Sequence, residues 1–332
     1  MRGGLSTVLP AMRSCVILSV CLTQPRMPII AVDEGSREQN AAAVGEAEGI
    51  LLDTAPLLPW PAASSAALRD DGCVFMPKAV SPSTVVALRS HCESELATKL
   101  SEVASGVASQ GDHFGAVLAR SSRHDLKLAL TPLIEEALSE VLGSIAPLVR
   151  GTLECAEGEE PVLAELGAIY STDGAPRQPL HSDTYRAAAP QLLTAFVALQ
   201  DITPSMGPTT FLPGTHRDEL AHAAILSPSL KADFLLSRPK RLGVMPAGAC
   251  TLYDSRLLHA GGANHDRPRW LFYAGFTPSR TLMRELRGKQ YEPLQRAAHT
   301  LSQLEGRDAG GESDAELEAM WAALLRPRDV LI

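Results

Sequence analysis

The feature that most constrains the fold is a series of short apolar runs in the second half of the chain. In each run apolar residues are continuous or alternate with polar ones, and clusters of Gly, Pro, Asn and Asp separate the runs. Runs this short, with this punctuation, are typical of β-strands. They cover residues 161–171, 191–202, 249–262 and 269–278.

Helical patterns flank these runs on both sides. Residues 81–100 carry apolar side chains at helical spacing, with Ser83 as a candidate N-cap. Residues 132–146 repeat an apolar residue every four positions after Thr131, and Pro147 is expected to end that helix. We therefore predict a mainly β fold, a sandwich or barrel, with flanking helices.

Three regions are expected along the chain. Residues 1–63 are predicted to form a flexible N-terminal arm: 1–32 contain three arginines and no acid, and 33–63 are rich in acidic residues, Ala and Pro without periodicity. The short apolar run within 1–32 makes that segment either a targeting peptide or a disordered arm. Residues 64–279 are expected to form the folded domain, and 280–332 a C-terminal helical extension.

Composition excludes several classes of protein. The chain has 30 Lys and Arg against 38 Asp and Glu, a net charge of −8, which argues against a nucleic-acid partner. No run approaches the roughly 18 apolar residues that span a bilayer, so no integral membrane association is expected. The six cysteines form no CxxC pair, so neither a disulfide scaffold nor a zinc knuckle is supported.

A metal site is indicated by His181 and Asp183 together with a distant histidine. In an extended strand these two side chains point the same way, with Cα atoms roughly 6.5 Å apart. An imidazole from a second strand, for which His259 is the natural candidate, completes a two-His, one-carboxylate set with open positions. A second His-x-Asp tripeptide, at residues 216–218, follows a Pro-Gly turn and is interpreted as a turn entering a helix.

An arginine ten residues beyond His259 strengthens this interpretation. Arg269 begins an apolar run that is expected to form a strand. A guanidinium binds a carboxylate through two parallel hydrogen bonds. A buried Arg269 beside a metal therefore suggests a dicarboxylate cosubstrate. Arg267, in the preceding turn, is expected to be an ordinary surface residue. Asp254 and Arg256 are expected to brace the strand that leads to His259, and Cys250 to be a buried small hydrophobe.

From about residue 70 to 279 the sequence resembles the phytanoyl-CoA dioxygenase family of Fe(II)/2-oxoglutarate oxygenases. Five blocks occur in the family's order: DGCV at 71–74, QPLHSD at 178–183, MGPTTFLPGTH at 206–216, DSRLLH at 254–259 and NHDRPR at 264–269. The resemblance implies a double-stranded β-helix of the jelly-roll, cupin-like type. It also implies iron held by His181, Asp183 and His259, the distal carboxylate of 2-oxoglutarate held by Arg269, and Phe196 near the cosubstrate.

The resemblance implies an enzyme that uses Fe(II), 2-oxoglutarate and O2 to hydroxylate a small-molecule or acyl substrate. The 2-oxoglutarate is converted to succinate and CO2, and ascorbate supports the reaction. A carboxylate at position 183 favours hydroxylation, since a small residue there would free a halide site as in related halogenases. Two alternatives stay open: a zinc-type hydrolase using the same three ligands, and a non-catalytic jelly-roll binding module.

The substrate and the oligomeric state are left open by the sequence. A cytoplasmic location is expected, with organellar or secretory targeting by residues 1–32 as the alternative. The chain ends in Val330, Leu331 and Ile332 rather than a Ser-Lys-Leu tripeptide, so a peroxisomal location is not supported.

Overall fold

The structure is a computed structural model that describes residues 34–117, 121–184, 191–279 and 299–306. The helices are α1 (Glu34–Thr54), α2 (Ser65–Asp71), α3 (Pro82–Ala104), α4 (Gln110–His113), α5 (Pro132–Thr152), α6 (Glu219–Leu226), α7 (Pro228–Ser237) and α9 (Leu301–Leu304), with 3-10 turns η1 (Pro204–Met206) and η2 (Thr215–Arg217). The strands are β1 (Cys73–Met76), β2 (Arg123–Lys127), β3 (Val162–Ser171), β4 (Leu193–Ala198), β5 (Thr209–Phe211), β6 (Arg241–Leu242), β7 (Cys250–Asp254), β8 (His259–Gly261) and β9 (Arg269–Thr277).

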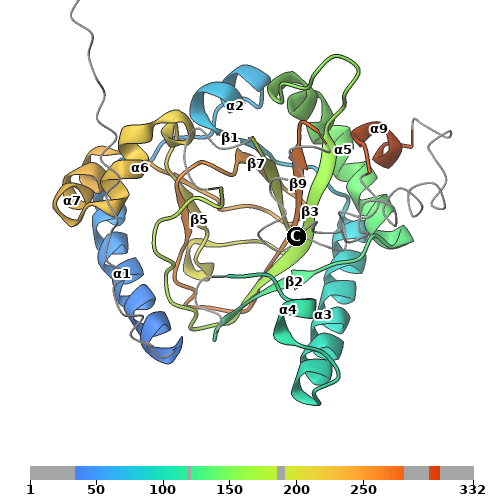
Figure 1. Cartoon of the computed structure of the whole chain (residues 1–332), viewed down its shortest axis with the longest axis horizontal. Coiled ribbons are helices and arrows are strands. Elements are labelled where there is room, and N and C mark those ends of the chain that lie inside the picture. Colours follow the sequence, from blue (N-terminus) through green and yellow to red (C-terminus); the bar gives the residue numbers. More distant parts are fainter. Residues whose placement is uncertain (1–33, 118–120, 185–190, 280–298, 307–332) are drawn as a thin grey trace, which may run out of the picture. The chain divides into compact units, whose positions relative to one another are not determined.

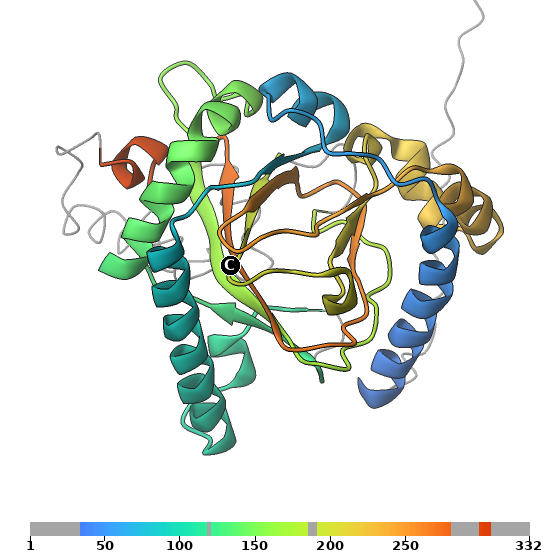
Figure 2. The ribbon, with the colours of Figure 1, turned by 180° about the vertical axis from the view of Figure 1, so that it is seen from behind.

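Two antiparallel sheets form the centre of the fold. The larger has the order β1-β7-β4-β9-β3-β2, and the smaller the order β6-β5-β8. The two sheets face each other, with α3 and α5 beside the larger sheet and α1, α6 and α7 on the side of the smaller one (Figure 1 and Figure 2). The predicted mainly β, jelly-roll fold with flanking helices is confirmed. Strands β3, β4, β7, β8 and β9 lie within the four predicted runs and β5 and β6 lie between them, whereas β1 and β2 precede the first run and were not predicted.

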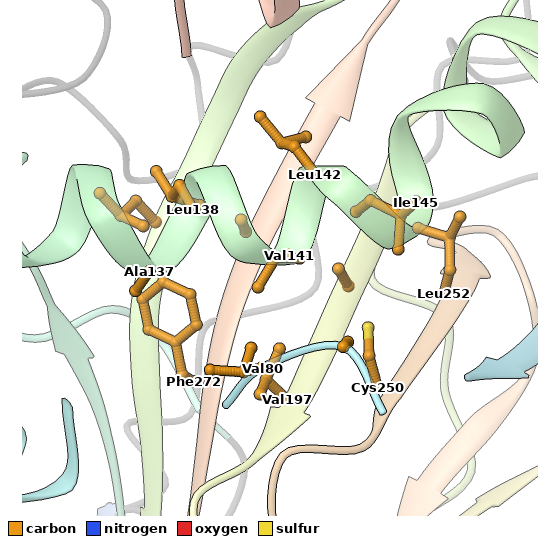
Figure 3. Close-up of a cluster of buried hydrophobic side chains, with 14 of the residues drawn as sticks. Val80, Ala137, Leu138, Val141, Leu142, Ile145, Val197, Cys250, Leu252 and Phe272 are labelled. Carbon is orange, nitrogen blue, oxygen red and sulfur yellow. The ribbon is translucent and has the colours of Figure 1, made fainter. Parts of the chain in front are cut away.

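Helix α5 covers the outer face of the larger sheet. Thr131 caps it by accepting a hydrogen bond from the backbone N–H of Ile134, and Pro132 occupies the first turn, where its missing N–H costs nothing. One face of α5 is fully buried against strands β4, β7 and β9, as Figure 3 shows for Leu138, Val141, Ile145 and their partner Phe272. This interface is the main hydrophobic core of the protein.

The prediction that Pro147 ends this helix was wrong, since α5 continues to Thr152 with Pro147 inside it. A proline in a helix removes one hydrogen bond and crowds the carbonyl four residues earlier, which here belongs to Gly143. Residues on both sides of the proline are buried in the same core, including Ala146 and Val149, and their burial offsets the lost bond.

The predicted cap of α3 was two residues too late. Ser81, rather than Ser83, is the N-cap: its hydroxyl accepts from the backbone N–H of Thr84, and Pro82 follows it in the first turn. The Glu140 carboxylate on α5 accepts from the backbone N–H of Ser81 at 2.6 Å, which ties the start of α3 to α5. Sequence spacing alone does not show that long-range contact.

The prediction that residues 33–63 belong to a flexible arm was also wrong. Helix α1 lies within that segment, Leu52 is fully buried and Glu48 is 3% exposed. The Glu48 carboxylate accepts hydrogen bonds from the backbone N–H of Leu180 at 2.5 Å and from Lys231 Nζ at 2.8 Å. These polar contacts join α1 to residues far away in the sequence. A polar contact of this kind produces no apolar periodicity, so the sequence pattern did not reveal the helix.

The ends of the chain are described only in part. The candidate targeting segment, residues 1–32, and most of the predicted C-terminal helical extension, residues 280–298 and 307–332, lie outside the described residues. Within that extension the short helix α9 packs against α5, with Glu305 accepting from Arg150 at 2.6 Å. Among the described residues, no helix is long and apolar enough to cross a bilayer.

The α5 interface supplies a stability prediction. Leu142→Ala deletes a fully buried side chain and leaves a cavity against the sheet, so we expect a loss of about 2–5 kcal/mol in the free energy of unfolding, measured by denaturant titration. Val86→Ala on α3, where the side chain is 70% exposed, is the matched control and should change it by less than about 0.5 kcal/mol. Equal effects of the two variants would contradict this assignment of the core.

Candidate active site

Three side chains of the predicted metal set meet at the smaller sheet. His259 begins β8, and His181 pairs with it through two backbone hydrogen bonds of 3.0 and 2.8 Å, an isolated bridge rather than the expected continuous strand. Asp183 follows two residues later in a bend. One ligand atom from each residue lies within 4.8 Å of the other two, and no other such His, Cys, Asp and Glu cluster occurs among the described residues.

The hydrogen bonds of the two imidazoles determine which nitrogens face the centre. Nδ1 of His181 lies 2.8 Å from the carbonyl oxygen of Pro179, and Nδ1 of His259 lies 2.9 Å from that of Leu257. A carbonyl oxygen only accepts, so each Nδ1 carries a proton, and in the neutral form of each ring the lone pair is on Nε2. The Nε2 atoms lie 3.7 and 3.5 Å from the Asp183 carboxylate oxygens.

The electrostatics of the cluster suit metal binding. Burial, followed by the neighbouring His259, lowers the pKa of His181 to about 4, so this imidazole is neutral near pH 7, as a ligand must be. Tyr253 on β7 donates from its hydroxyl to Asp183 Oδ2 at 2.9 Å and orients the carboxylate. Burial raises the pKa of Tyr253, which keeps the donor protonated. Two imidazoles and one carboxylate form the donor set that fits iron(II).

Arg269 supplies a buried positive charge at the start of β9. The residue is 3% exposed; Nη1 donates to the carbonyl oxygen of Gly207, and Nη2 lies 3.3 Å from the hydroxyl of Ser171. Its Nε has no hydrogen-bond partner among the described residues. Burial, and then the charge of Arg123, lowers the pKa of Arg269 to about 9. A buried guanidinium with an unsatisfied N–H fits a carboxylate ligand.

A second buried arginine, Arg123, was not identified as a candidate site residue from the sequence. Arg123 begins β2, is 1% exposed and lies in register with Ser171, which in turn pairs with Arg269 across β3 and β9. Its Nη2 donates to the carbonyl oxygen of Gly262 at 3.1 Å, while Nε and Nη1 have no partner in the described part of the chain. The sequence does contain a signal for this strand, because charged residues occupy every second position at 123, 125 and 127.

Two carboxylates inside the larger sheet were also missed. Asp125, two residues after Arg123 on the same face of β2, accepts from the Tyr273 hydroxyl at 2.7 Å and is 4% exposed. Glu165 on β3 lies over Gly275, where an added Cβ would come within 2.9 Å of Oε2. Burial raises the pKa of both carboxyl groups, and the charge of Asp183 raises both further.

The remaining sequence expectations concern residues near the site. Phe196 on β4 contacts the rings of Tyr253 and Tyr273, with centroids 5.0 and 6.3 Å apart, and its role toward a cosubstrate stays a prediction. Arg256 Nη2 and Asp254 Oδ2 lie 2.6 Å apart, and this ion pair agrees with the expectation that the two residues brace the strand leading to His259.

The expectations for Cys250 and for the second His-x-Asp tripeptide, residues 216–218, are confirmed. Cys250 is fully buried in the core. In the second His-x-Asp tripeptide His216 contacts the carbonyl oxygen of Arg69 at 3.0 Å, and Asp218 caps α6.

The sequence profile of the family described as phytanoyl-CoA dioxygenase (PhyH) matches residues 68–267. Among curated proteins, no sequence matches the chain.

Several solved structures share part of the fold. The epimerase SnoN in complex with Fe3+, alpha ketoglutarate and nogalamycin RO is 22% identical, with 64% of this chain and 81% of that chain covered at a TM-score of 0.47. The carbocyclase SnoK from nogalamycin biosynthesis is 18% identical, with 64% and 82% covered and a TM-score of 0.49. HygX from Streptomyces hygroscopicus, with nickel and 2-oxoglutarate bound, is 15% identical, with 65% and 88% covered and a TM-score of 0.46.

Proposed function

Since the chain belongs to the phytanoyl-CoA dioxygenase family of Fe(II)/2-oxoglutarate-dependent oxygenases, we propose that it hydroxylates a small-molecule substrate at the cluster of His181, Asp183 and His259. The observation that carries the proposal is the pairing of this cluster with Arg269, a buried guanidinium whose Nε lacks a protein partner in the described residues. A metal and a dicarboxylate are the two ligands that these groups accommodate together.

Each residue has a definite task in this proposal. Nε2 of His181, Nε2 of His259 and the Asp183 carboxylate hold iron(II), and the backbone carbonyls at Nδ1 keep both rings oriented. Arg269 binds the distal carboxylate of 2-oxoglutarate, with the Ser171 hydroxyl beside it. When bound, iron(II), 2-oxoglutarate and O2 supply the oxidation, and the cosubstrate leaves as succinate and CO2.

The identity of residue 183 selects the type of reaction. A carboxylate at this position occupies a metal coordination site that a halide would otherwise take, so hydroxylation is favoured over halogenation. Tyr253 supports that role because its hydroxyl is directed at Oδ2 of Asp183.

Cosubstrate turnover tests the proposal directly. Purified protein with Fe(II), ascorbate and 2-oxoglutarate is expected to release succinate, slowly without a prime substrate, and to lose this activity on chelation and regain it when iron is restored. Elemental analysis should find about one iron per chain after anaerobic reconstitution. Iron-free protein after reconstitution, or no turnover with a broad panel of metabolites, would favour the non-catalytic binding module instead.

A further inference from the structure

The segment that carries His181 lies along β8, which is an edge of the smaller sheet. The N–H of His181 donates to the carbonyl oxygen of His259 at 3.0 Å, and the N–H of Gln178 donates to that of Gly261 at 2.9 Å. The N–H of Leu180, between them, donates instead to a side chain of helix α1. The segment is therefore held by β8 and by α1 together.

Glu48 on α1 accepts the hydrogen bond from Leu180. Its Oε2 lies 2.5 Å from the backbone nitrogen of Leu180, and its Oε1 accepts from Nζ of Lys231 on α7 at 2.8 Å. Glu48 is 3% exposed and Leu180 is 6% exposed, so removal of the carboxylate would leave a buried N–H without its acceptor. Glu48 therefore fixes the backbone one residue before a proposed iron ligand.

A single peptide group joins Glu48 to the ring of His181. The N–H of Leu180 and the C=O of Pro179 belong to the same planar peptide unit. Glu48 accepts from this N–H, and the C=O of the same unit accepts from Nδ1 of His181 at 2.8 Å. The carboxylate thus orients the peptide that orients the imidazole, and its charge polarises the C=O into a stronger acceptor.

Glycines on α1 allow the helix to approach this segment closely. A Cβ built on Gly45 would collide with the carbonyl oxygen of Arg177, and one built on Gly49, one turn later, would collide with the Arg177 side chain. Glu46 accepts from the backbone N–H of Arg177 at 3.2 Å, and Asp53 accepts from its Nη2 at 3.2 Å. Contacts with α1 therefore begin four residues before His181.

Hydrophobic contacts join α1 to both proposed histidine ligands. Leu180 and Leu258, which directly precede these ligands in the sequence, share a buried cluster with Leu52 of α1 and Leu235 of α7. Figure 1 shows α1 and α7 side by side, on the side of the smaller sheet. Helix α1 precedes residues 68–267, which the family profile matches, so the support that it gives comes from outside the matched region.

We propose that Glu48 is a positioning residue for the iron centre, which sets the place and ring orientation of His181 through the peptide group between Pro179 and Leu180. The inference rests on the proposed function, because it concerns a ligand of that same metal. Since Glu48 does not touch the metal, its effect should appear in metal affinity before any turnover takes place.

Metal titration tests the proposal without turnover. Fe(II) and Co(II) are each titrated anaerobically into metal-free protein against a competing chelator, well below the unfolding temperature of every variant. Glu48→Ala is expected to weaken binding of both metals about 10- to 100-fold, the usual cost of losing a group that orients a metal ligand. Unchanged affinity for both metals in this variant would overturn the proposal.

Glu140→Ala on α5 is the matched control for a general loss of stability. The Glu140 carboxylate also accepts from the backbone N–H of another element, that of Ser81 at 2.6 Å, and this bond ties α5 to α3. We expect Glu140→Ala to lower the thermal unfolding midpoint, as Glu48→Ala does, but to change metal affinity by less than about two-fold. An equal loss of metal affinity in the two variants would mean that Glu48 acts only through stability, and the proposal would be wrong.

A double-mutant cycle shows whether Glu48 acts through His181. If it does, Glu48→Ala should weaken Co(II) binding by less than about two-fold in a His181→Ala protein, because the ring that it orients is gone. Co(II) is the probe because sites of this type bind it more tightly than Fe(II), which keeps the weakened affinity measurable. A loss of about 10-fold or more in the His181→Ala background would contradict the proposed path.

A substitution on the glycine face of α1 tests the contact independently. Gly45→Ala places a methyl group against the carbonyl oxygen of Arg177 and should displace α1 from the segment, so we expect metal binding to weaken about 10-fold or more. Gly143→Ala makes the same change inside α5, where the added Cβ meets nothing within 4 Å, and should leave metal binding unchanged. Unchanged binding in Gly45→Ala would reject the role of α1.

These results distinguish a failure of this proposal from a failure of the proposed function. A wild-type protein that binds neither Fe(II) nor Co(II) would reject the function itself. A wild-type protein that binds both metals, with Glu48→Ala equal to it, would reject only the positioning role of Glu48.

Discussion

Replacing Asp183 with alanine is expected to lower iron affinity by more than about 100-fold and to reduce succinate release to background. Loss of a group that merely supports a metal ligand typically costs 10- to 100-fold, and Asp183 is proposed as a ligand itself. The side chain is 40% exposed, so its removal should not unfold the protein. Iron content after reconstitution and the rate of succinate release, with and without added substrates, measure the two effects.

Asp266→Ala is the control for this variant, because Asp266 is an exposed aspartate in the turn before β9. It should keep both iron and turnover. If Asp183→Ala retained stoichiometric iron and normal succinate release, His181 and His259 could not be acting with Asp183 at one iron centre, and the proposed site would be wrong.

Arg269→Ala is expected to raise the Kd for 2-oxoglutarate by roughly 30-fold to several thousand-fold. Truncating one partner of a buried, hydrogen-bonded charge pair costs about 2–5 kcal/mol, and every 1.4 kcal/mol is a factor of ten in affinity. Arg269→Lys keeps the charge and loses the planar fork, so it should recover only part of the affinity. Anaerobic titration of the iron-loaded protein measures both values.

The choice of ligand separates a direct contact from a general loss of structure. 2-Oxopentanoate has the same chelating end as 2-oxoglutarate but lacks the distal carboxylate, so it should bind wild type and Arg269→Ala about equally. Arg267→Ala, two residues away and exposed, should bind 2-oxoglutarate normally. If Arg269→Ala left 2-oxoglutarate binding and activity unchanged, the zinc-type hydrolase alternative would gain support.

Local pattern was sufficient for most of the strands and for the helix that covers them. The apolar runs that contain β3, β4, β7, β8 and β9 are visible because a strand buried on both faces carries a nearly continuous run of apolar residues, and turn residues separate one run from the next. Pro147 shows where this reasoning fails: the local preference to end a helix there is outweighed by burial of the residues around it, including Val149 two residues later. For α1 the error has the opposite direction: the local sequence predicted no helix, and the long-range contacts of Glu48 stabilise one.

The candidate metal ligands were accessible from sequence because their chemistry is distinctive: a His-x-Asp tripeptide, a later histidine and an arginine beyond it stand out in one chain. Three other charged residues of the larger sheet could not be identified from the sequence. Arg123, Asp125 and Glu165 are ordinary charged residues until strand register places β2 beside β3 and β3 beside β9, with Arg123, Ser171 and Arg269 in one row. Residues distant in sequence come to share one face of a sheet only when the strands pair. The sequence by itself therefore determined the fold class and the candidate iron ligands, and only the tertiary structure decided which charges surround them.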